Sequence, residues 1–555
     1  MSGSKPIPVN PMSPTHRIHA PMGMGVARDV ATRASSAPSR TARWLALGAF
    51  ALYLATGGGR IVGSDEVTMF EVSRALLTGR VAVPEGATMQ GRDGRFYSKN
   101  AAGQAVLAMP LVAAGSAIAR AAHLGPDQRV LIERAVTSAF NAAVTALLLA
   151  AFYLALRAFG VGGPAALGAA LLLGFTTPVW VYAKSFMAEP LQALGLLLAL
   201  TGSARAALGE RSGPRLAALG AFFAISAKLS MLPIAIVCLV PLLEAPRRTW
   251  IWPAAGVALA LAGHAAYDMA RFGSPFETGY GAQATAAAYT TPWWVGVYGL
   301  LFSSGKGVAW YAPVLWLAPA GMLAMTSGAR PYAEASGERA MTRRRAFGML
   351  AVAIVLAWLF TLFLYGRFQH WAGDGSYGPR YLVPLLPIGF IPVAFALDRM
   401  ADARRVLALA LGALGFAVAI GGVAIYFGAA MREVGDYPYQ LPLDHPRFME
   451  GSHFDPHDAP PIVHWRMLRR NVGEHLAGHA PRLGGADSGP RDPRTGLSAA
   501  EQRGLLHGLD FWSAYAAYEG LPAAPLVAIA LLLAAFGAGA LRRAARGASA
   551  EERAP

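Results

Sequence analysis

Apolar stretches of membrane-crossing length alternate with short polar stretches along most of this chain. The first lies at about 44–58 and the last at 522–541, and between them are runs near 130–157, 163–183, 187–204, 215–228, 229–245, 250–270, 308–326, 347–365, 381–397 and 406–427. About 20 apolar residues in a helix cross a hydrocarbon core of about 30 Å. The pattern therefore predicts an all-α polytopic membrane protein with a bundle of about 12 transmembrane helices.

Composition agrees with this pattern. Of 555 residues, 55% are hydrophobic and 14% are charged, whereas soluble domains carry about 25% charged residues. A net charge of +16 can indicate a nucleic-acid partner. Most of the surplus of basic residues, however, lies in short loops between the apolar runs, where basic residues determine the orientation of membrane helices. We therefore expect no nucleic-acid partner. The one cysteine, Cys238, lies in an apolar run, which excludes an internal disulfide.

The basic loops predict the orientation of the helices. Arginines cluster in five places: Arg205, Arg211 and Arg215; Arg247 and Arg248; Arg343, Arg344 and Arg345; Arg404 and Arg405; and Arg542, Arg543 and Arg546. If all of these face the cytoplasm, both termini lie inside and four segments face outward: 59–129, 271–307, 366–380 and 428–521. The four outer segments would then lie on the non-cytoplasmic side of the membrane, in the periplasm or outside.

The same pattern divides the chain. Residues 1–43 are polar and are expected to form a disordered cytoplasmic tail, followed by a transmembrane region at 44–427 that contains the outer loop 59–129. A large outer-face loop at 428–521, the last transmembrane helix at 522–541 and a cytoplasmic tail at 542–555 complete it.

Two stretches leave the number of spans open. The runs at 215–228 and 229–245 are short, and they fit either a tight hairpin or one kinked segment. Residues 101–121 have the composition of a span, but counting them as one would invert every later loop. We expect 101–121 to be a juxtamembrane helix that lies on the outer face.

The first outer loop begins with two adjacent carboxylates. Asp65 and Glu66 stand about one helical turn beyond the first span. Such a pair suits a general base, or it could hold a divalent cation. Capping of the following helix by Asp65 explains the spacing equally well.

The same loop ends with Tyr97 and Lys99, just before the expected juxtamembrane helix. A lysine at the membrane surface can bind a phosphate as a compact point charge. The alternative is that Lys99 extends to lipid head groups.

Together, the two ends of this loop resemble the GT-C superfamily of glycosyltransferases, and within it the branch of protein O-mannosyltransferases and lipid A aminoarabinose transferases. Members take a sugar from a polyprenyl-phosphate donor at the outer face of the membrane. The resemblance implies that Asp65 is the catalytic carboxylate, with Glu66 beside it, and that Lys99 contacts the donor phosphate. The family's lysine is often followed by proline, whereas Asn100 follows here.

Two further stretches, 271–281 with 299–314 and then 370–387, resemble an uncharacterised bacterial subgroup with this first loop, and the resemblance implies a bacterial inner membrane. In the second, Gly378 and Pro379 precede Arg380, whose guanidinium can bind phosphate with two parallel hydrogen bonds. The same loop supplies three candidates for substrate binding, His370, Asp374 and Tyr377. An interfacial Arg–Tyr belt is the alternative.

Three weaker candidates complete the set. Lys306 is flanked by glycine and serine, as in an anion-binding loop, but no phosphate-loop spacing is present and an ordinary loop explains it better. Glu189 lies at the outer end of a span near Lys184, and fits a substrate site or a helix-end ion pair. His453, Asp455, His457 and Asp458 could bind a metal, but prolines interrupt them, and we expect no metal site there.

These observations predict an inverting glycosyltransferase that moves a sugar from a polyprenyl-phosphate donor to a cell-envelope acceptor (a lipid, a glycan or a protein) at the outer face. No cofactor is required. A transporter or flippase of a lipid-linked or hydrophilic solute, and a non-catalytic membrane scaffold, are the alternatives. Clustering of charges in outer loops, without visible internal repeats, favours the enzyme over the transporter.

Overall fold

The computed structural model describes residues 23–86, 88–327, 338–400, 402–437, 440–442, 445, 447–483 and 498–553. Residues 1–22 of the expected tail, and 484–497 of the large outer segment, lie outside this described part. The first helix, α1, spans Gly23–Ala55. Residues 23–43, which we expected to be disordered, are therefore helical and continue the first membrane helix toward the amino terminus.

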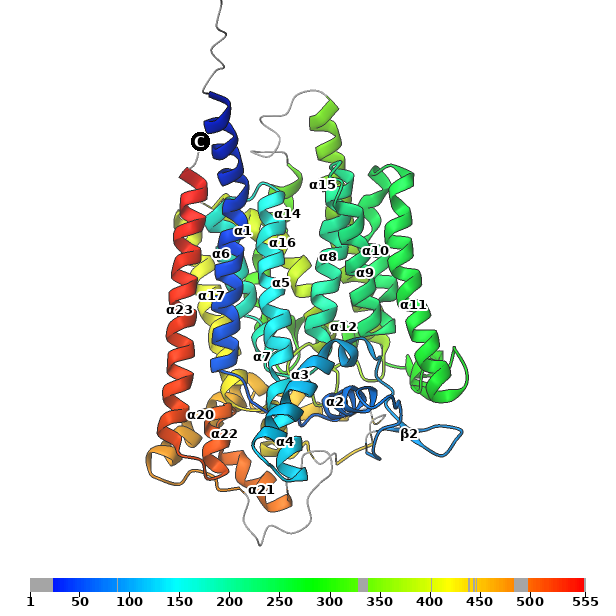
Figure 1. The fold of residues 1–555 in the computed structure, drawn as a ribbon, viewed down its shortest axis with the longest axis vertical. Coiled ribbons are helices and arrows are strands. Elements are labelled where there is room, and N and C mark those ends of the chain that lie inside the picture. The colour runs from blue at the N-terminus through cyan, green and yellow to red at the C-terminus, as the bar shows by residue number, and fades with distance from the viewer. Residues whose placement is uncertain are drawn as a thin grey trace, which may run out of the picture.

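Long helices stand side by side and form the body of the molecule (Figure 1). They are α1, α5 (Ala139–Ala158), α6 (Gly163–Phe175), α8 (Glu189–Ala207), α9 (Gly213–Ala227), α10 (Leu232–Cys238), α11 (Ile251–Phe272), α14 (Ala318–Thr326), α15 (Glu338–Arg367), α16 (Leu386–Asp398), α17 (Asp402–Ala424) and α23 (Ala523–Arg553). Within the described residues, 6 helices are long and apolar enough to cross a membrane, and five shorter apolar helices accompany them. The predicted all-α polytopic architecture is confirmed.

The 19-residue helix α3, several shorter helices and two short strands gather at one end of this bundle, opposite the end where α1 begins and α23 finishes (Figure 1). They are α2 (Ser64–Leu76), β1 (Met89–Gln90), β2 (Phe96–Tyr97), α3 (Gly103–Ala121), α4 (Pro126–Thr137), α18 (Phe427–Glu433), α19 (Glu450–Phe454), α20 (Pro460–Leu476), α21 (Ala499–Gly504) and α22 (Trp512–Tyr518). β1 and β2 form an antiparallel hairpin in which Met89 pairs with Tyr97. We call this end of the molecule the loop end.

The remaining elements connect the long helices. They are α7 (Val179–Ala183), α12 (Trp293–Phe302), α13 (Val308–Tyr311) and the 3₁₀ turns η1 (Leu229–Met231), η2 (Val240–Glu244), η3 (Arg247–Trp250), η4 (Gly281–Ala284), η5 (Ala286–Ala288), η6 (Pro313–Leu317), η7 (Arg380–Leu385) and η8 (Leu505–His507).

Helix α3 corresponds to the stretch at 101–121. It is long and apolar enough to cross a membrane, yet it lies at the loop end beside α2 and α4 and does not run along the long helices (Figure 1). Its position agrees with a juxtamembrane helix, which remains a prediction because no membrane accompanies the structure.

The ambiguous run at 215–245 is a hairpin. Helix α9 ends at Ala227, Lys228 has an extended backbone, and η1, α10 and η2 continue the chain. Glycines let α8 and α9 pack closely, because a Cβ at Gly195 would lie 2.4 Å from the backbone of Ala224. Small residues at such a crossing are typical of helix pairs in membranes. The hairpin turns at Lys228, which therefore lies at the loop end beside the start of α8.

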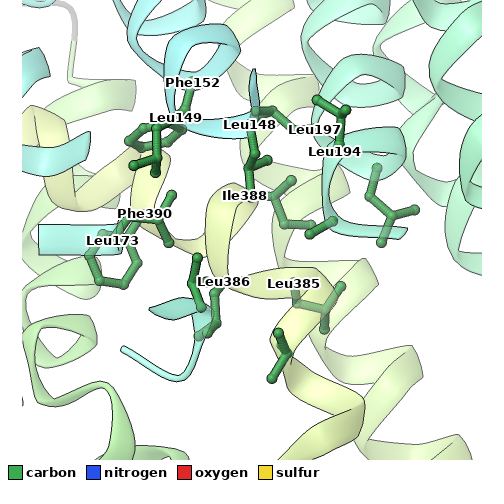
Figure 2. Close-up of a cluster of buried hydrophobic side chains, with 14 of the residues drawn as sticks. Leu148, Leu149, Phe152, Leu173, Leu194, Leu197, Leu385, Leu386, Ile388 and Phe390 are labelled. Carbon is green, nitrogen blue, oxygen red and sulfur yellow. The ribbon is translucent and has the colours of Figure 1, made fainter. Parts of the chain in front are cut away.

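The core lies where α5, α6, α8 and α16 meet. Figure 2 shows leucine, isoleucine and phenylalanine side chains from these helices pointing toward one another, among them Phe152, Leu173, Leu197 and Phe390. All four side chains are fully buried. This packing fixes η7, whose first residue is Arg380, and α8, whose first residue is Glu189. Both are candidate site residues.

Candidate active site

Helix α2 presents its two carboxylates to different surroundings. Glu66 bends back so that one oxygen accepts the Gly63 N–H (2.8 Å) and the other accepts the Phe186 N–H (2.5 Å). It is 3% exposed, and burial raises its pKa despite these bonds. Glu66, and not Asp65, therefore completes the amino-terminal cap of α2, in the position that a capping-box glutamate occupies.

Asp65 is thereby left to face the rest of the site. Its Oδ2 accepts a hydrogen bond from Arg380 Nη2 at 3.0 Å, and Arg380 Nε donates to Glu189 Oε1 at 2.5 Å. Burial raises the pKa of Asp65, but the charges of Arg380 and Lys99 outweigh burial and hold the pKa below its ordinary value. Asp65 is therefore ionised at neutral pH. Residues 65, 189 and 380 come from three segments that lie far apart in the sequence.

Two lysines lie beside this carboxylate. Lys99 follows β2, and its Nζ lies 5.6 Å from the centre of the Tyr280 ring. Lys228, at the turn of the α9 hairpin, places its Nζ 5.3 Å from the centre of the Tyr381 ring. Both lysines and Arg380 line one cavity with Asp65, so three cations surround one face of the carboxylate.

That cavity has a volume of 360 Å³ and lies among the long helices. We call it the bundle cavity, because bundle helices supply part of its wall, including His264, Asp268 and Arg271 of α11 and Tyr365 of α15. Lys228 and the segments at 99–101 and 278–289 supply much of the rest. Arg271 is buried, pairs with Asp268 and donates to the Ser98 carbonyl.

A second cavity of 320 Å³ lies on the other side of the same group. We call it the outer cavity, because the segment after 425 supplies much of its wall: Tyr426, Phe427, Arg432, Tyr437, Gln502 and Leu505. Asp65, Lys99, Gly373, Asp374 and Arg380 line both cavities. The ionised carboxylate is thus accessible from two chambers with different walls.

A third space adjoins the bundle cavity. It has a volume of 220 Å³ and lies between α3, α9 and α11, with His264 in the walls of both. Its lining is mainly apolar and includes Val106, Phe222, Phe223 and Ala260. We call it the apolar annex, since it extends the cationic bundle cavity with a hydrocarbon-compatible surface.

The partition between the two main cavities is the loop at 370–376. His370 Nδ1 lies 3.0 Å from Asp374 Oδ1, and both residues line the bundle cavity. Asp374 has a φ of 49°, a left-handed conformation that is unfavourable for a residue with a Cβ. Gly373 (φ 72°) packs against Arg380, because a Cβ there would lie 3.0 Å from the Arg380 Cβ. The loop therefore helps to position Arg380.

Lys306 supports this loop from behind. It is 2% exposed and lines neither cavity, and its Nζ donates to the carbonyls of Asp374 (2.9 Å) and Ser376 (2.6 Å). Burial lowers the pKa of Lys306 to about 7. The anion-binding alternative for Lys306 is wrong, because its ammonium group is enclosed by backbone carbonyls.

Two other predicted substrate-binding residues lie away from the cavities. Tyr377 is buried and donates from its hydroxyl to the Val418 carbonyl at 2.9 Å. Tyr97 donates to Asp93 Oδ2 at 2.7 Å, and its ring packs against Phe272. Both tyrosines are structural supports. The prediction that they are substrate ligands is wrong, since neither lines the bundle cavity or the outer cavity.

The helix-end ion pair with Lys184, which was one of the two alternatives for Glu189, does not form. Lys184 Nζ instead lies 2.9 Å from Asp510 Oδ2, and Arg60 Nη2 lies 2.6 Å from Oδ1 of the same carboxylate. Burial raises the pKa of Asp510, but the two cations outweigh it and lower the pKa to about 2. This buried triad attaches the segment before α22 to the bundle and leaves Glu189 to pair with Arg380.

The carboxylates of Asp65 and Glu66 offer few free oxygen ligands to a divalent cation. Both Glu66 oxygens accept backbone N–H groups, and Asp65 already contacts Arg380. Elsewhere in the described residues, no three His, Cys, Asp or Glu side chains form a metal-ligating group. The residues around Asp65 therefore do not fit the cation that the adjacent carboxylates suggested.

Lys228 and the Asp268–Arg271 pair were not among the predicted site residues. The signal for Lys228 was available, because an ionisable residue inside an apolar run indicates a functional site by default. Its position depends on whether 215–245 folds as a hairpin or as one kinked segment, and the sequence left both open. Arg271 and Asp268 fall at the end of the run at 250–270, where interfacial charges are common.

Comparisons with known proteins complete the description. No family model matches the chain, and no curated protein matches it. The structure is similar to two crystal structures of ArnT from Cupriavidus metallidurans, one bound to undecaprenyl phosphate (16% identity) and one in the apo state (14% identity). Each similarity covers 94% of this chain and 78% of that chain, with a TM-score of 0.45. These are distant likenesses in overall shape, and the chemistry of this chain is inferred from its own side chains.

Proposed function

We propose that this protein is an inverting glycosyltransferase that moves a sugar from a polyprenyl-phosphate donor to a cell-envelope acceptor. One observation carries the proposal: two cavities with different walls meet at a single ionised carboxylate, Asp65, that is flanked by cations. A group-transfer enzyme needs such an arrangement, because two substrates must approach one reacting centre from different sides.

The bundle cavity suits the donor. Lys99, Lys228 and Arg380 supply positive charge for a phosphate, and the apolar annex next to them can receive the first part of a polyprenyl chain. A lipid-phosphate donor has these two parts joined, a charged head and a hydrocarbon tail. The annex lies between α3, α9 and α11, so the rest of the tail would continue into the bilayer.

The outer cavity suits the acceptor. It lies at the loop end, and its wall comes largely from the segment that we expect to face outward. In the proposed reaction, an acceptor hydroxyl gives its proton to Asp65 while its oxygen attacks the anomeric carbon. The bond from that carbon to the phosphate oxygen breaks, and polyprenyl phosphate leaves with the electron pair. A single displacement inverts the anomeric configuration.

The cations act where negative charge grows. Lys99 and Lys228 would stabilise the departing phosphate, whose charge increases in the transition state. Arg380 links Asp65 to Glu189, so its first role is to keep the base ionised and oriented, and it adds positive charge to the same cavity.

The decisive experiment is turnover by the purified protein with a panel of polyprenyl-phosphate pentoses and hexoses, read as release of polyprenyl phosphate. Asp65→Asn serves as the control because it keeps the side-chain shape and removes basicity. Wild-type protein that binds such donors and moves them across vesicle membranes without breaking the glycosyl bond would identify a flippase. Absence of both activities with every donor would favour the scaffold.

Orientation is a separate part of the proposal. We place the loop end, and with it Asp65, at the periplasmic or outer face, with both termini in the cytoplasm, because the arginine clusters lie in loops of the other face. In a Cys238→Ser background, Arg92→Cys should react with an impermeant thiol reagent in intact cells, and Arg546→Cys should react only after lysis. The reverse pattern would place the site in the cytoplasm.

A further inference from the structure

Helix α20 has two contrasting faces. Its inner face contains Val463, His464, Met467 and Asn471, which are 0–1% exposed. Asn471 donates from its amide to the carbonyls of Leu506 and Gly508 (2.9 and 2.8 Å), and so joins the helix to η8. This face packs against α17, α18 and η8. Since α18 and η8 supply part of the outer-cavity wall, α20 supports that wall from behind.

The opposite face is exposed, yet it is apolar and basic. Positions spaced by three and four residues lie on one side of a helix. On this side are Ile462 (53% exposed), Trp465 (45%), Val472 (39%) and Leu476 (85%), with the exposed arginines Arg466 and Arg469. No acidic residue lies on this face. Four large apolar side chains in full contact with water would be costly, so something other than water covers them.

The location of Trp465 indicates what covers this face. Its indole Nε1 donates to the carbonyl of Ala417 in α17 at 2.9 Å. Ala417 stands seven residues before the last residue of α17, Ala424, which is about 10 Å along a helix axis. A tryptophan about 10 Å from the end of a membrane helix lies at the depth of the interfacial aromatic belt.

The exposed face of α20 also continues an apolar surface. Helix α17 is long and apolar enough to cross a membrane, and it exposes Leu407, Leu409, Leu414 and Phe416. Exposed apolar side chains along a transmembrane helix contact lipid. Because Trp465 joins α20 to this helix, the apolar side chains of α20 extend the lipid-contacting surface around the loop end.

We propose that α20 is an interfacial helix that binds the surface of the lipid leaflet at the loop end, with anionic phospholipid head groups as the partners of its arginines. Helices that lie in a membrane interface combine an apolar face with Lys and Arg. Arg466 and Arg469 are exposed between the apolar side chains, and one amino group of Arg466 donates to the His457 carbonyl at 2.9 Å. In the proposed arrangement both guanidinium groups lie at the level of the head groups. The bilayer thereby holds in place the helix that supports the outer-cavity wall.

The experiment measures water and lipid exposure at single positions of the full chain. In a Cys238→Ser background, nitroxide labels are attached at Ile462→Cys and Leu476→Cys, with Leu359→Cys as the lipid-exposed control and Arg92→Cys as the water-exposed control. The protein is reconstituted at one copy per nanodisc. Collision rates are measured with oxygen, which concentrates in lipid, and with a neutral nickel chelate, which stays in water.

We expect positions 462 and 476 to be about 5-fold less accessible to the nickel chelate than position 92 and more accessible to oxygen. This is the result for side chains that lie in the membrane interface. Accessibility equal to that at position 92 would overturn the proposal. Protection that appears only when discs hold two copies would also overturn it, because a second copy of the chain would then cover α20.

The lipid charge is tested in the same samples. Discs that contain phosphatidylglycerol should protect positions 462 and 476 more than discs of phosphatidylcholine alone, and Arg466→Gln with Arg469→Gln should remove that difference. If protection is the same in both lipids, the anionic partner is wrong. The control at position 92 should not respond to lipid composition, which distinguishes local binding from a general effect of surface charge.

Discussion

The two cavities that meet at Asp65 are built in different ways. Bundle helices, the turn after α9 and the segments at 99–101 and 278–289 form the wall of the bundle cavity, whereas the segment after residue 425 forms much of the wall of the outer cavity. The bundle cavity contains Lys228 and opens toward an apolar annex, while the outer cavity contains Arg432, Tyr437 and Gln502. The difference teaches that one carboxylate can be reached through two chambers whose walls come from different parts of the chain, so that each wall can be altered separately.

The largest effect should come from the group that both cavities share. Asp65→Asn removes the base, and loss of general-base catalysis costs about 10²–10⁴-fold in rate. Donor affinity should be almost unchanged, because Lys99 and Lys228 remain. Single-turnover rates, measured beside donor binding, test this.

Glu66→Gln is the matched control for that variant. Because Glu66 caps α2 through two backbone N–H groups, we expect a lower melting temperature and a rate within about 10-fold of wild type, since a lost cap costs about 1 kcal/mol. A larger rate loss in Glu66→Gln than in Asp65→Asn would move the base to Glu66. Normal turnover in both variants would exclude this loop from catalysis.

Substitution of Lys228 and of Lys99 should affect the donor and the acceptor differently. Lys228 lines only the bundle cavity, whereas Lys99 lines both. Lys228→Ala should raise the donor KM by about 10–100-fold, the cost of a hydrogen bond to a charged group, and leave the acceptor KM unchanged. Lys99→Ala should affect both substrates.

The arginine variants are the controls for these lysines. Lys228→Arg and Lys99→Arg should retain more activity than the alanine variants, because positive charge near the phosphate is the required property. An acceptor KM that rises as much as the donor KM in Lys228→Ala would contradict the assignment of the two cavities.

The charged group that the two cavities share was more predictable than the walls around it. Asp65, Lys99 and Arg380 were identified because charges are scarce in an apolar chain and because three outer loops resemble a known superfamily. The bundle itself follows from apolar runs, whose length is set by the membrane. Lys228 was missed because its location depends on a hairpin turn within one apolar run, which hydropathy alone does not resolve.

The segment 428–521 was less predictable. Its polar, proline-rich sequence suggested a loop, yet its described residues form α18 to α22. These helices depend on tertiary contacts, such as those of Asn471 with the carbonyls of Leu506 and Gly508, which local propensity does not contain. For the same reason the sequence could not show that Glu66, rather than Asp65, caps α2. It also could not predict that Lys306 supports a loop.

A smaller effect should come from filling the apolar annex. Gly263 lines this space, and no heavy atom lies within 4 Å of where its Cβ would be. Gly263→Leu should therefore occupy the annex without a clash and raise the KM of a long-chain polyprenyl donor by about 10-fold, the effect of a few lost apolar contacts. A donor with a short chain should be unaffected.

Gly348→Leu in α15 is the matched control, since Gly348 also has open space at its Cβ and lines none of the three cavities. It should leave both donors unchanged. If Gly263→Leu slows the two donors equally, the annex does not hold the lipid chain.

The smallest effect concerns the wall between the cavities, and it depends on pH. Burial lowers the pKa of Lys306 from 10.5 to about 7, so the folded protein releases this proton near pH 7 while the unfolded chain keeps it to about pH 10.5. Between these values the unfolded state binds more protons, and the free energy of unfolding rises with pH by at most about 1.4 kcal/mol per unit from this group. Below pH 7 both states are protonated, and the cost of burying the charge is fully present.

Activity should change in the opposite direction over the same pH range. An ammonium group donates stronger hydrogen bonds to the Asp374 and Ser376 carbonyls than a neutral amine does, so the loop that positions Arg380 should be held less firmly above pH 7. The difference between a charged and a neutral hydrogen bond is about 1 kcal/mol, and we expect kcat/KM to fall by about 5-fold. Lys306→Met, compared with wild type from pH 6 to 9, should lack both the rise in melting temperature and the fall in kcat/KM that Lys306 contributes. Identical pH profiles for the two proteins would mean that Lys306 keeps one protonation state throughout, and that the shared wall of the two cavities is fixed by the His370–Asp374 contact instead.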